Sequence, residues 1–295
     1  MNEHAKTPAI TQAMIDAYDE YTHLTLDRRG FMEKLTKLAG SGAAAAAIAP
    51  LLAANPARAA IVAADDSRVS AQDATWPGAS GEMKGYLVRP ASQSGALPAA
   101  IVVHENRGLN DHIRDVARRL ALEGFVALAP DFLSPLGGTP ADEEQARQMF
   151  SRLDAAQTAA DGAATVTYLE GLEGSNGKVG AIGFCWGGGT VNDIAVASPA
   201  LDAGVAYYGR QPKAEDVAKI HAALLLHYAG LDERVNAGID AFRAALEKAG
   251  KEFTIHVYEG ANHAFNNDTS EARYDKAAAE LAWQRTVDFL HAKLG

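Results

Sequence analysis

The sequence predicts an α/β fold with one doubly wound, mostly parallel sheet and helices on both of its faces. Short apolar runs alternate with helical segments along most of the chain, and this alternation builds parallel strands joined by crossover helices. The run 97–104 is apolar almost throughout, as expected of a strand that is buried on both faces. Another short apolar run, 178–182, leads through a glycine-rich turn into a helical stretch at 190–197. A chain of 295 residues can hold one large domain and an appendage.

The expected strands are short apolar runs, and the expected helices are longer segments between them. The run 83–88 is expected to be a strand at the edge of the sheet. Two helices, broken near Asp154, are expected within 142–172. The other expected elements are a helix at 111–123, a strand at 125–129, strands at 203–208 and 222–228, a helix at 236–249, a strand at 253–257 and a closing helix at 271–293.

The charge and the cysteine content exclude several classes of protein. Lys and Arg total 27 and Asp and Glu total 37, so the net charge is −10, which argues against a general nucleic-acid-binding protein. The single cysteine excludes an internal disulfide, and no Cys-His cluster in the sequence indicates structural zinc. We therefore expect a small-molecule substrate, no cofactor and no metal.

Residues 1–59 differ in character from the rest of the chain. Ile10, Met14, Tyr18 and Tyr21 fall at helical spacing, so an amphipathic helix can form there. A basic pair at 28–29, a weakly apolar Ala/Gly run at 38–54 and a small-x-small site at 57–59 follow in the order of an export signal.

The paired arginines, with a phenylalanine two residues later, resemble a twin-arginine signal. The apolar run is too short for a stable membrane span of ~20 residues. We expect export by the twin-arginine machinery to the periplasm, with a mature chain beginning near Ala60. The alternative is a retained N-terminal helix and arm on a cytoplasmic protein. Residues 60–80 read as a polar linker, and residues 81–295 as a single domain.

The glycine-rich turn has the pattern G-x-nucleophile-x-G, formed by Gly183, Cys185 and Gly187. A sharp strand-to-helix turn holds such a nucleophile in a strained conformation, and the flanking glycines leave room for the neighbouring backbone. The helix start behind the cysteine favours a thiolate and can hold an oxyanion. The structural alternatives are a small buried apolar cysteine, or a phosphate loop, which here lacks the expected lysine.

Two further catalytic candidates each follow a strand. Asp232 comes after the apolar run ending near 230, and His263 comes after the run ending near 260. The chain order nucleophile, acid, histidine is that of the α/β-hydrolase fold. Asp232 would orient His263, which would carry the proton of Cys185 and of the leaving group. Each residue also has a structural alternative. Asp232 could serve only to cap a turn, and His263 could be a solvent-exposed loop histidine.

A third group follows the strand at 97–104. Glu105 is a carboxylate near the expected position of the thiol and can take its proton if its pKa is raised. The backbone N–H of Asn106, together with that of Trp186, would form the oxyanion hole. Arg107 would hold an anionic substrate or pair with Glu105. The alternative for Glu105 is a helix-capping role.

With these motifs, the chain resembles the dienelactone hydrolase (carboxymethylenebutenolidase) family. The resemblance covers roughly 81–295 and rests on Glu105, 183–188, 207–209, 230–232 and 258–265. It implies an α/β-hydrolase that opens lactone or ester bonds through an acyl-enzyme on cysteine. It further implies that Glu105 takes the proton of Cys185 when substrate binds. Tyr208 and Phe265, within the matching segments, are candidates for substrate binding.

One departure from the family concerns the substrate carboxylate. Members that act on dienelactone have an arginine four residues after the catalytic histidine, whereas this chain has Asn267 there. A thioesterase or acyl transferase with the same acyl-enzyme is one rival hypothesis. A non-catalytic binding protein on the hydrolase fold is another.

Overall fold

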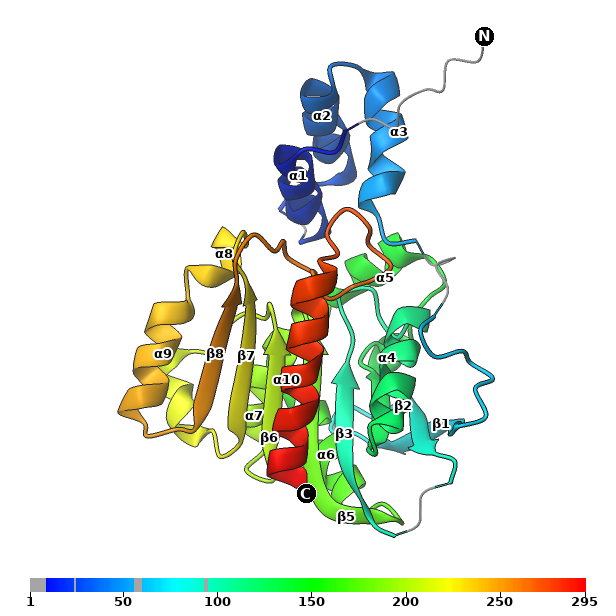
Figure 1. Cartoon of the computed structure of the whole chain (residues 1–295), viewed down its shortest axis with the longest axis vertical. Helices are drawn as coiled ribbons and strands as arrows, with labels where there is room; N and C mark the ends of the chain where they lie inside the picture. Colours follow the sequence, from blue (N-terminus) through cyan, green and yellow to red (C-terminus); the bar gives the residue numbers. More distant parts are fainter. Residues whose placement is uncertain (1–8, 24, 56–59, 93–94) are drawn as a thin grey trace.

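The chain forms an eight-stranded sheet in the order β1-β2-β4-β3-β5-β6-β7-β8 (Figure 1). The computed structural model describes residues 9–23, 25–55, 60–92 and 95–295. β1 and β2 are antiparallel to their neighbours, and all later pairs are parallel. The strands are β1 (Val69–Pro77), β2 (Glu82–Pro90), β3 (Leu97–Val103), β4 (Val126–Asp131), β5 (Ser175–Phe184), β6 (Ala203–Tyr207), β7 (Ala223–Ala229) and β8 (Phe253–Tyr258).

Helices cover both faces of this sheet, so the predicted α/β-hydrolase architecture is confirmed. α4 (Asp111–Leu122) and α10 (Lys276–Leu294) cover one face. α6 (Ala155–Glu170), α7 (Trp186–Ala197) and α9 (Ile239–Lys248) cover the other. The shorter elements are α5 (Glu143–Phe150), α8 (Glu233–Asn236) and the 3-10 turns η1 (Ser134–Leu136) and η2 (Ala214–Lys219).

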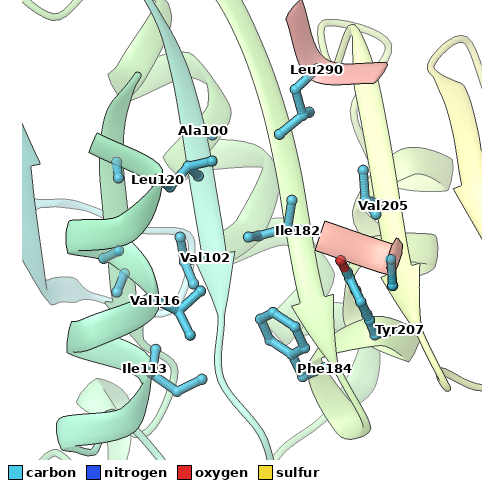
Figure 2. Packing of buried hydrophobic residues seen from close by; sticks show 14 of the residues in the cluster. Ala100, Val102, Ile113, Val116, Leu120, Ile182, Phe184, Val205, Tyr207 and Leu290 are labelled. Carbon is cyan, nitrogen blue, oxygen red and sulfur yellow. The ribbon is translucent and has the colours of Figure 1, made fainter. Parts of the chain in front are cut away.

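The strand pleat explains why both faces are apolar. Ala100 and Val102 of β3 point to the face under α4, where they meet Val116 (Figure 2). Ile101 and Val103, one residue out of step, join the core under α6 and α7. A strand buried on both faces must be apolar at every position, which is why the run 97–104 predicted β3.

The helix break predicted near Asp154 is confirmed. α5 ends at Phe150, and Asp154 caps the start of α6 by accepting a hydrogen bond from the backbone N–H of Gln157 at 2.8 Å. A side-chain oxygen at this position satisfies one of the free N–H groups of the first turn.

The predicted linker at 60–80 is wrong in part, because β1 lies within it. β1 is an edge strand whose only buried side chains are Ala74 and Trp76, two residues apart. Trp76 donates a hydrogen bond to Thr165 of α6 at 3.1 Å. β2, predicted as the edge, is therefore the second strand. A strand with one solvated face needs few apolar residues, so its sequence reads as polar.

An N-terminal helical unit precedes the sheet and consists of α1 (Gln12–Thr22), α2 (Arg28–Ala39) and α3 (Gly42–Leu52). Its own core is formed by Met14, Ile15, Ala17, Tyr18, Phe31, Leu35, Ala45, Ile48 and Leu52. In Figure 1 the unit lies above the ends of the central strands, beside α5 and α8.

Among the described residues, no single helix is long and apolar enough to cross a membrane. α2 and α3 taken together have the required length and composition, but they are bent by 113° relative to each other. The helix predicted over 10–21 corresponds to α1. The predicted export and removal of residues 1–59 stay predictions.

The turn between β5 and α7 predicts a large effect of a small substitution. A Cβ at Gly183 would lie 2.2 Å from the backbone oxygen of Gly187, so Gly183→Ala forces the backbone apart. We expect the free energy of unfolding to fall by ~2 kcal/mol or more, measured by thermal and urea unfolding. The control is Gly42→Ala at the exposed start of α3, where a Cβ meets nothing within 4 Å and the change should be within ~1 kcal/mol of neutral. Equal stabilities of the two variants would contradict this packing.

Candidate active site

Cys185 stands at the sharp turn between β5 and α7. Its backbone has a positive φ, with φ 57° and ψ −114°, which costs energy for a non-glycine residue. A Cβ at Gly187 would lie 2.4 Å from the backbone oxygen of Val103, so the turn lies tightly against β3. The Cys185 N–H donates to the Tyr207 oxygen of β6 at 3.0 Å. Three adjacent strands therefore fix the thiol at the carboxyl edge of the sheet.

Asp232 and His263 form a buried pair beside it. Nδ1 of His263 lies 2.5 Å from Oδ2 of Asp232, and both side chains are at most 5% exposed. The other carboxylate oxygen of Asp232 accepts the backbone N–H of Val235 at the start of α8. The acid thus caps a helix and contacts the histidine at the same time, and its catalytic role stays a prediction.

The remaining nitrogen of His263 faces the thiol. Nε2 of His263 is buried and has no hydrogen-bond partner among the described residues. Cys185 and His263 each offer a donor atom within 4.8 Å of the other, so direct proton transfer between them requires a closer approach or one bridging water. Burial lowers the pKa of His263, but Asp19, Cys185 and Asp232 together raise it well above its ordinary value.

The thiol is correspondingly acidic. Burial would raise the pKa of Cys185, but the imidazoles of His263 and His23 lower it to about 6. The thiolate is the nucleophilic form, so the site is arranged for attack at neutral pH.

The two residues predicted to donate to an oxyanion both lie beside Cys185. Trp186 is the first residue of α7, and Asn106 follows β3. Neither backbone N–H has an acceptor among the described residues, and both residues line the cavity next to Cys185. Free N–H groups at a helix start, reinforced by the helix dipole, stabilise negative charge there.

A cavity of about 270 Å³ opens beside the thiol. Within the described ranges, its lining contains three arginines and no carboxylate. The lining residues are Thr22, His23, Asn106, Arg147, Phe150, Ser151, Cys185, Trp186, Thr190, Tyr208, Arg210, Arg234, Val235 and His263.

Of the three predicted substrate-binding residues, only Tyr208 lines this cavity. Its ring packs on His263 at 4.9 Å between centroids, and its hydroxyl has no partner among the described residues. Phe265 is a correction: it is fully buried against Tyr208 and Tyr258 and does not reach the cavity.

Arg107 is a second correction, because it is buried outside the cavity. Its Nη2 donates to the hydroxyl of Tyr18 at 3.0 Å, and Nη1 lies 3.6 Å from Glu143. The arginine fork that the sequence suggested for an anionic substrate is thus used to hold α1.

Glu105 is held by a different partner from the one expected. Its Oε2 accepts a hydrogen bond from Nδ2 of Asn267 at 2.8 Å. Burial would raise the pKa of Glu105, but Arg107, His112 and other nearby cations keep it below its ordinary value. Among the described residues no hydrogen bond joins Glu105 to Cys185, and the transfer of the thiol proton to Glu105 on substrate binding stays a prediction.

The residue that sequence reasoning missed is His23. Its Nε2 lies 3.4 Å from Sγ of Cys185, across 162 positions of sequence. No motif marks it, because it lies in the segment that reads as an export signal. Asp19, Arg147, Arg210 and Arg234 were also missed, and only the fold brings them to the site.

A set of metal donors results from this placement. Cys185, His23 and His263 each offer one donor atom, all within 4.8 Å of one another. A thiolate with two imidazoles suits a soft divalent ion such as Zn²⁺. The same groups are needed free for nucleophilic chemistry, so assays of the thiol call for a chelator in the buffer.

Comparison with known proteins places the chain among hydrolases. A model of the "Dienelactone hydrolase family" matches residues 83–294, a range that begins after the N-terminal helical unit. An Escherichia coli O157:H7 protein, named provisionally as a carboxymethylenebutenolidase, is 35% identical over 252 residues, which cover 80% of this chain and 92% of that protein.

Solved structures agree with this placement. A Klebsiella pneumoniae subsp. pneumoniae MGH 78578 protein, named provisionally as a dienelactone hydrolase, is 31% identical with a TM-score of 0.67, over 75% of this chain and 97% of that chain. The bacterial brefeldin A esterase, at 16% identity, shares the fold with a TM-score of 0.64 over 97% of this chain and 94% of that chain.

The acidity of the thiol predicts its alkylation profile. Cys185 is the only cysteine, so iodoacetamide consumption reports this residue alone. We expect the second-order rate to rise with pH to a plateau with a midpoint near 6, because the pKa of the thiol is lowered to about 6. Stopped-time labelling read by mass spectrometry gives the profile, with Cys185→Ala as the unlabelled control. A midpoint at the ordinary value of about 8.5 would contradict the assignment.

Proposed function

Because the chain belongs to the dienelactone hydrolase family, we propose that it hydrolyses lactones or esters through an acyl-enzyme on Cys185. The observation that carries this proposal is the thiol in a strained turn with the His263–Asp232 pair beside it. The finer step, covalent catalysis by cysteine, is supported by the low pKa of the thiol and by the free N–H groups of Trp186 and Asn106. No cofactor enters the scheme.

The reaction runs in two balanced halves. The Cys185 thiolate attacks the carbonyl carbon, and the oxyanion binds the N–H groups of Trp186 and Asn106. The C–O bond to the leaving group breaks as the imidazolium of His263 gives that oxygen its proton. Neutral His263 then takes a proton from water, the resulting hydroxide attacks the thioester, and the thiolate leaves. Asp232 stabilises the imidazolium in both halves.

The cavity supports an anionic substrate. Arg147, Arg210 and Arg234 line it, and no Asp or Glu of the part of the chain that the structure describes does. A guanidinium binds a carboxylate through two parallel hydrogen bonds. We therefore propose that an acidic lactone or ester is held by this arginine set, which takes the place of the arginine that Asn267 replaces.

Removal of the nucleophile tests the covalent step. Cys185→Ala should lower kcat for aryl ester or lactone cleavage at least ~1000-fold, because no other thiol can form the acyl-enzyme. The fold should survive, as judged by circular dichroism and melting temperature, because the side chain is small. Activity above a hundredth of wild type would remove Cys185 from the mechanism. A thioesterase or acyl transferase would pass the same test, so product analysis with competing thiol and alcohol acceptors separates those activities.

Removal of one arginine tests the substrate class. Arg210 is half-exposed and pairs with Asp193, so Arg210→Gln should fold normally. We expect KM for a carboxylate-bearing aryl ester to rise ~10-fold, with little change for its neutral methyl-ester analogue. The matched control is Arg243→Gln on the exposed face of α9, away from the cavity. Equal effects on both substrates would contradict recognition of an anion.

A further inference from the structure

The N-terminal helical unit docks on the rim of the candidate active site through specific polar contacts. Nδ2 of Asn106 donates to the backbone oxygen of Thr22 at 2.6 Å, and Asp19 lies 3.6 Å from Arg234 of α8. Gln12, at the start of α1, donates to Asn262 at 2.5 Å. Arg107 holds the hydroxyl of Tyr18. These contacts lie along α1 and fix its carboxyl end over Cys185.

The residue delivered there is His23, at the end of α1. Its Nδ1 lies 2.8 Å from the backbone oxygen of Asp19 and 3.4 Å from the carboxylate of Asp19. An Nδ1–H donated to these acceptors fixes the ring and leaves Nε2 for the sulfur of Cys185, 3.4 Å away. The His23 ring meets the His263 ring edge-on, with centroids 4.8 Å apart.

Cys185 is therefore flanked by two histidines with two aspartates beside them, and the charge of Asp19 acts on both imidazoles. Asp232 supports His263, and Asp19 supports His23. Burial raises the pKa of Asp19, but His263 and His23 lower it below its ordinary value, so the carboxylate is charged. One of its oxygens is buried without a hydrogen-bond partner within the described part of the chain.

We propose that His23 is a second catalytic histidine, which takes the proton of Cys185 and holds it while His263 serves the leaving group and water. This rests on the proposed thiol mechanism. The S–H bond breaks, an N–H bond forms at Nε2 of His23, and the resulting imidazolium stays beside the thiolate. The thiolate is restored when the thioester is hydrolysed, so His23 keeps its proton through the cycle. Asp19 is its positioning residue.

The electrostatics of the pair agree with this assignment. Burial lowers the pKa of His23, but Cys185 and Asp19 raise it to about 9. The two shifts have opposite signs, as expected of a thiolate in contact with an imidazolium. The charged and titratable groups around the two partners are Asp19 of α1, Arg234 of α8, His263 with Asp232, the cavity-lining Arg147 and Arg210, and, near the thiol, Glu105, Arg107 and Tyr208.

Arg234 competes with Cys185 for the same nitrogen. Its Nη2 lies 2.9 Å from Nε2 of His23, and a guanidinium favours the neutral imidazole there. The side chain of Arg234 is 44% exposed and lies 3.6 Å from Asp19, so it can turn toward that carboxylate when His23 is charged. The effect of Arg234 on the alkylation midpoint can therefore be measured separately from that of His23, by substituting each residue in turn.

His23 does not fill the site. The cavity of about 270 Å³ lies beside both His23 and Cys185, so room for a substrate remains with the unit docked. This favours a catalytic contribution over a blocking one.

The test is His23→Gln, which keeps a polar side chain of similar reach. In the alkylation assay with chelator, we expect the midpoint to rise from near 6 toward about 8.5, short of it because His263 remains, and the rate below pH 6 to fall several-fold because less thiolate is present there. Acylation, measured in single-turnover ester cleavage, should slow about 100-fold. In His23→Ala, added imidazole should restore part of both rates.

Two control variants separate the histidine from its surroundings. His221→Gln, at the exposed amino end of β7 and far from the site, should change neither rate. Arg234→Gln should move the midpoint less than His23→Gln does. Should His23→Gln fail to fold, Asp19→Asn keeps the histidine and removes a negative charge that His23 and His263 both face, so the midpoint should still rise.

Three outcomes would overturn the proposal. One is an unchanged alkylation profile in His23→Gln, and a second is faster ester cleavage, which would make His23 an obstruction. The third is a mature protein that begins near Ala60 in its native host, as the export hypothesis expects, because the working enzyme would then lack His23. Alkylation does not depend on turnover, so a failure of the proposed function, seen as full activity in Cys185→Ala, is distinguishable from a failure here.

Discussion

The close approach of backbone at the turn between β5 and α7 is the constraint on which the site depends. Gly183, Gly187 and the carbonyl groups they face leave no space for side chains, and this packing holds Cys185 at φ 57°. The strain is sustained because β3, β5 and β6 lie in register around the turn. The sulfur consequently projects from the sheet edge, with α7 behind it and loops from three strands around it.

Much of the sheet and its helices was predictable from the sequence, because the apolar pattern of each strand there matches its burial in the folded protein. Strands buried on both faces are apolar at each position, and ligand-binding residues follow the carboxyl ends of parallel strands. Cys185, Asp232 and His263 could therefore be selected without knowledge of contacts. β1 was missed because an edge strand with two buried side chains, Ala74 and Trp76, reads like a polar linker.

The roles of polar residues near the site were less predictable, since a partner decides each role. An arginine such as Arg107 can bind an anionic substrate, but its guanidinium here donates to the hydroxyl of Tyr18 and lies beside the carboxylate of Glu143. Glu105 has the chemistry of a base, yet Asn267 and neighbouring cations hold it as a carboxylate. His23 could not be predicted at all. An amphipathic pattern indicates that one face of α1 is buried, but it does not indicate which part of the protein covers that face. Paired arginines before an Ala/Gly run fit an export signal and a short helical unit equally well.

The distance along the chain between His23 and Cys185 also orders the events of synthesis. The N-terminal helical unit leaves the ribosome first, and the thiol follows 162 residues later, before Asp232 and His263 exist. A nascent chain thus carries a cysteine without the charged neighbours that lower its pKa, so it has the ordinary reactivity of a thiol. The pKa of the thiol falls when His263, and with it His23, lies beside the sulfur at the edge of the finished sheet. Chemical reactivity is therefore acquired last, and an incomplete chain does not carry it.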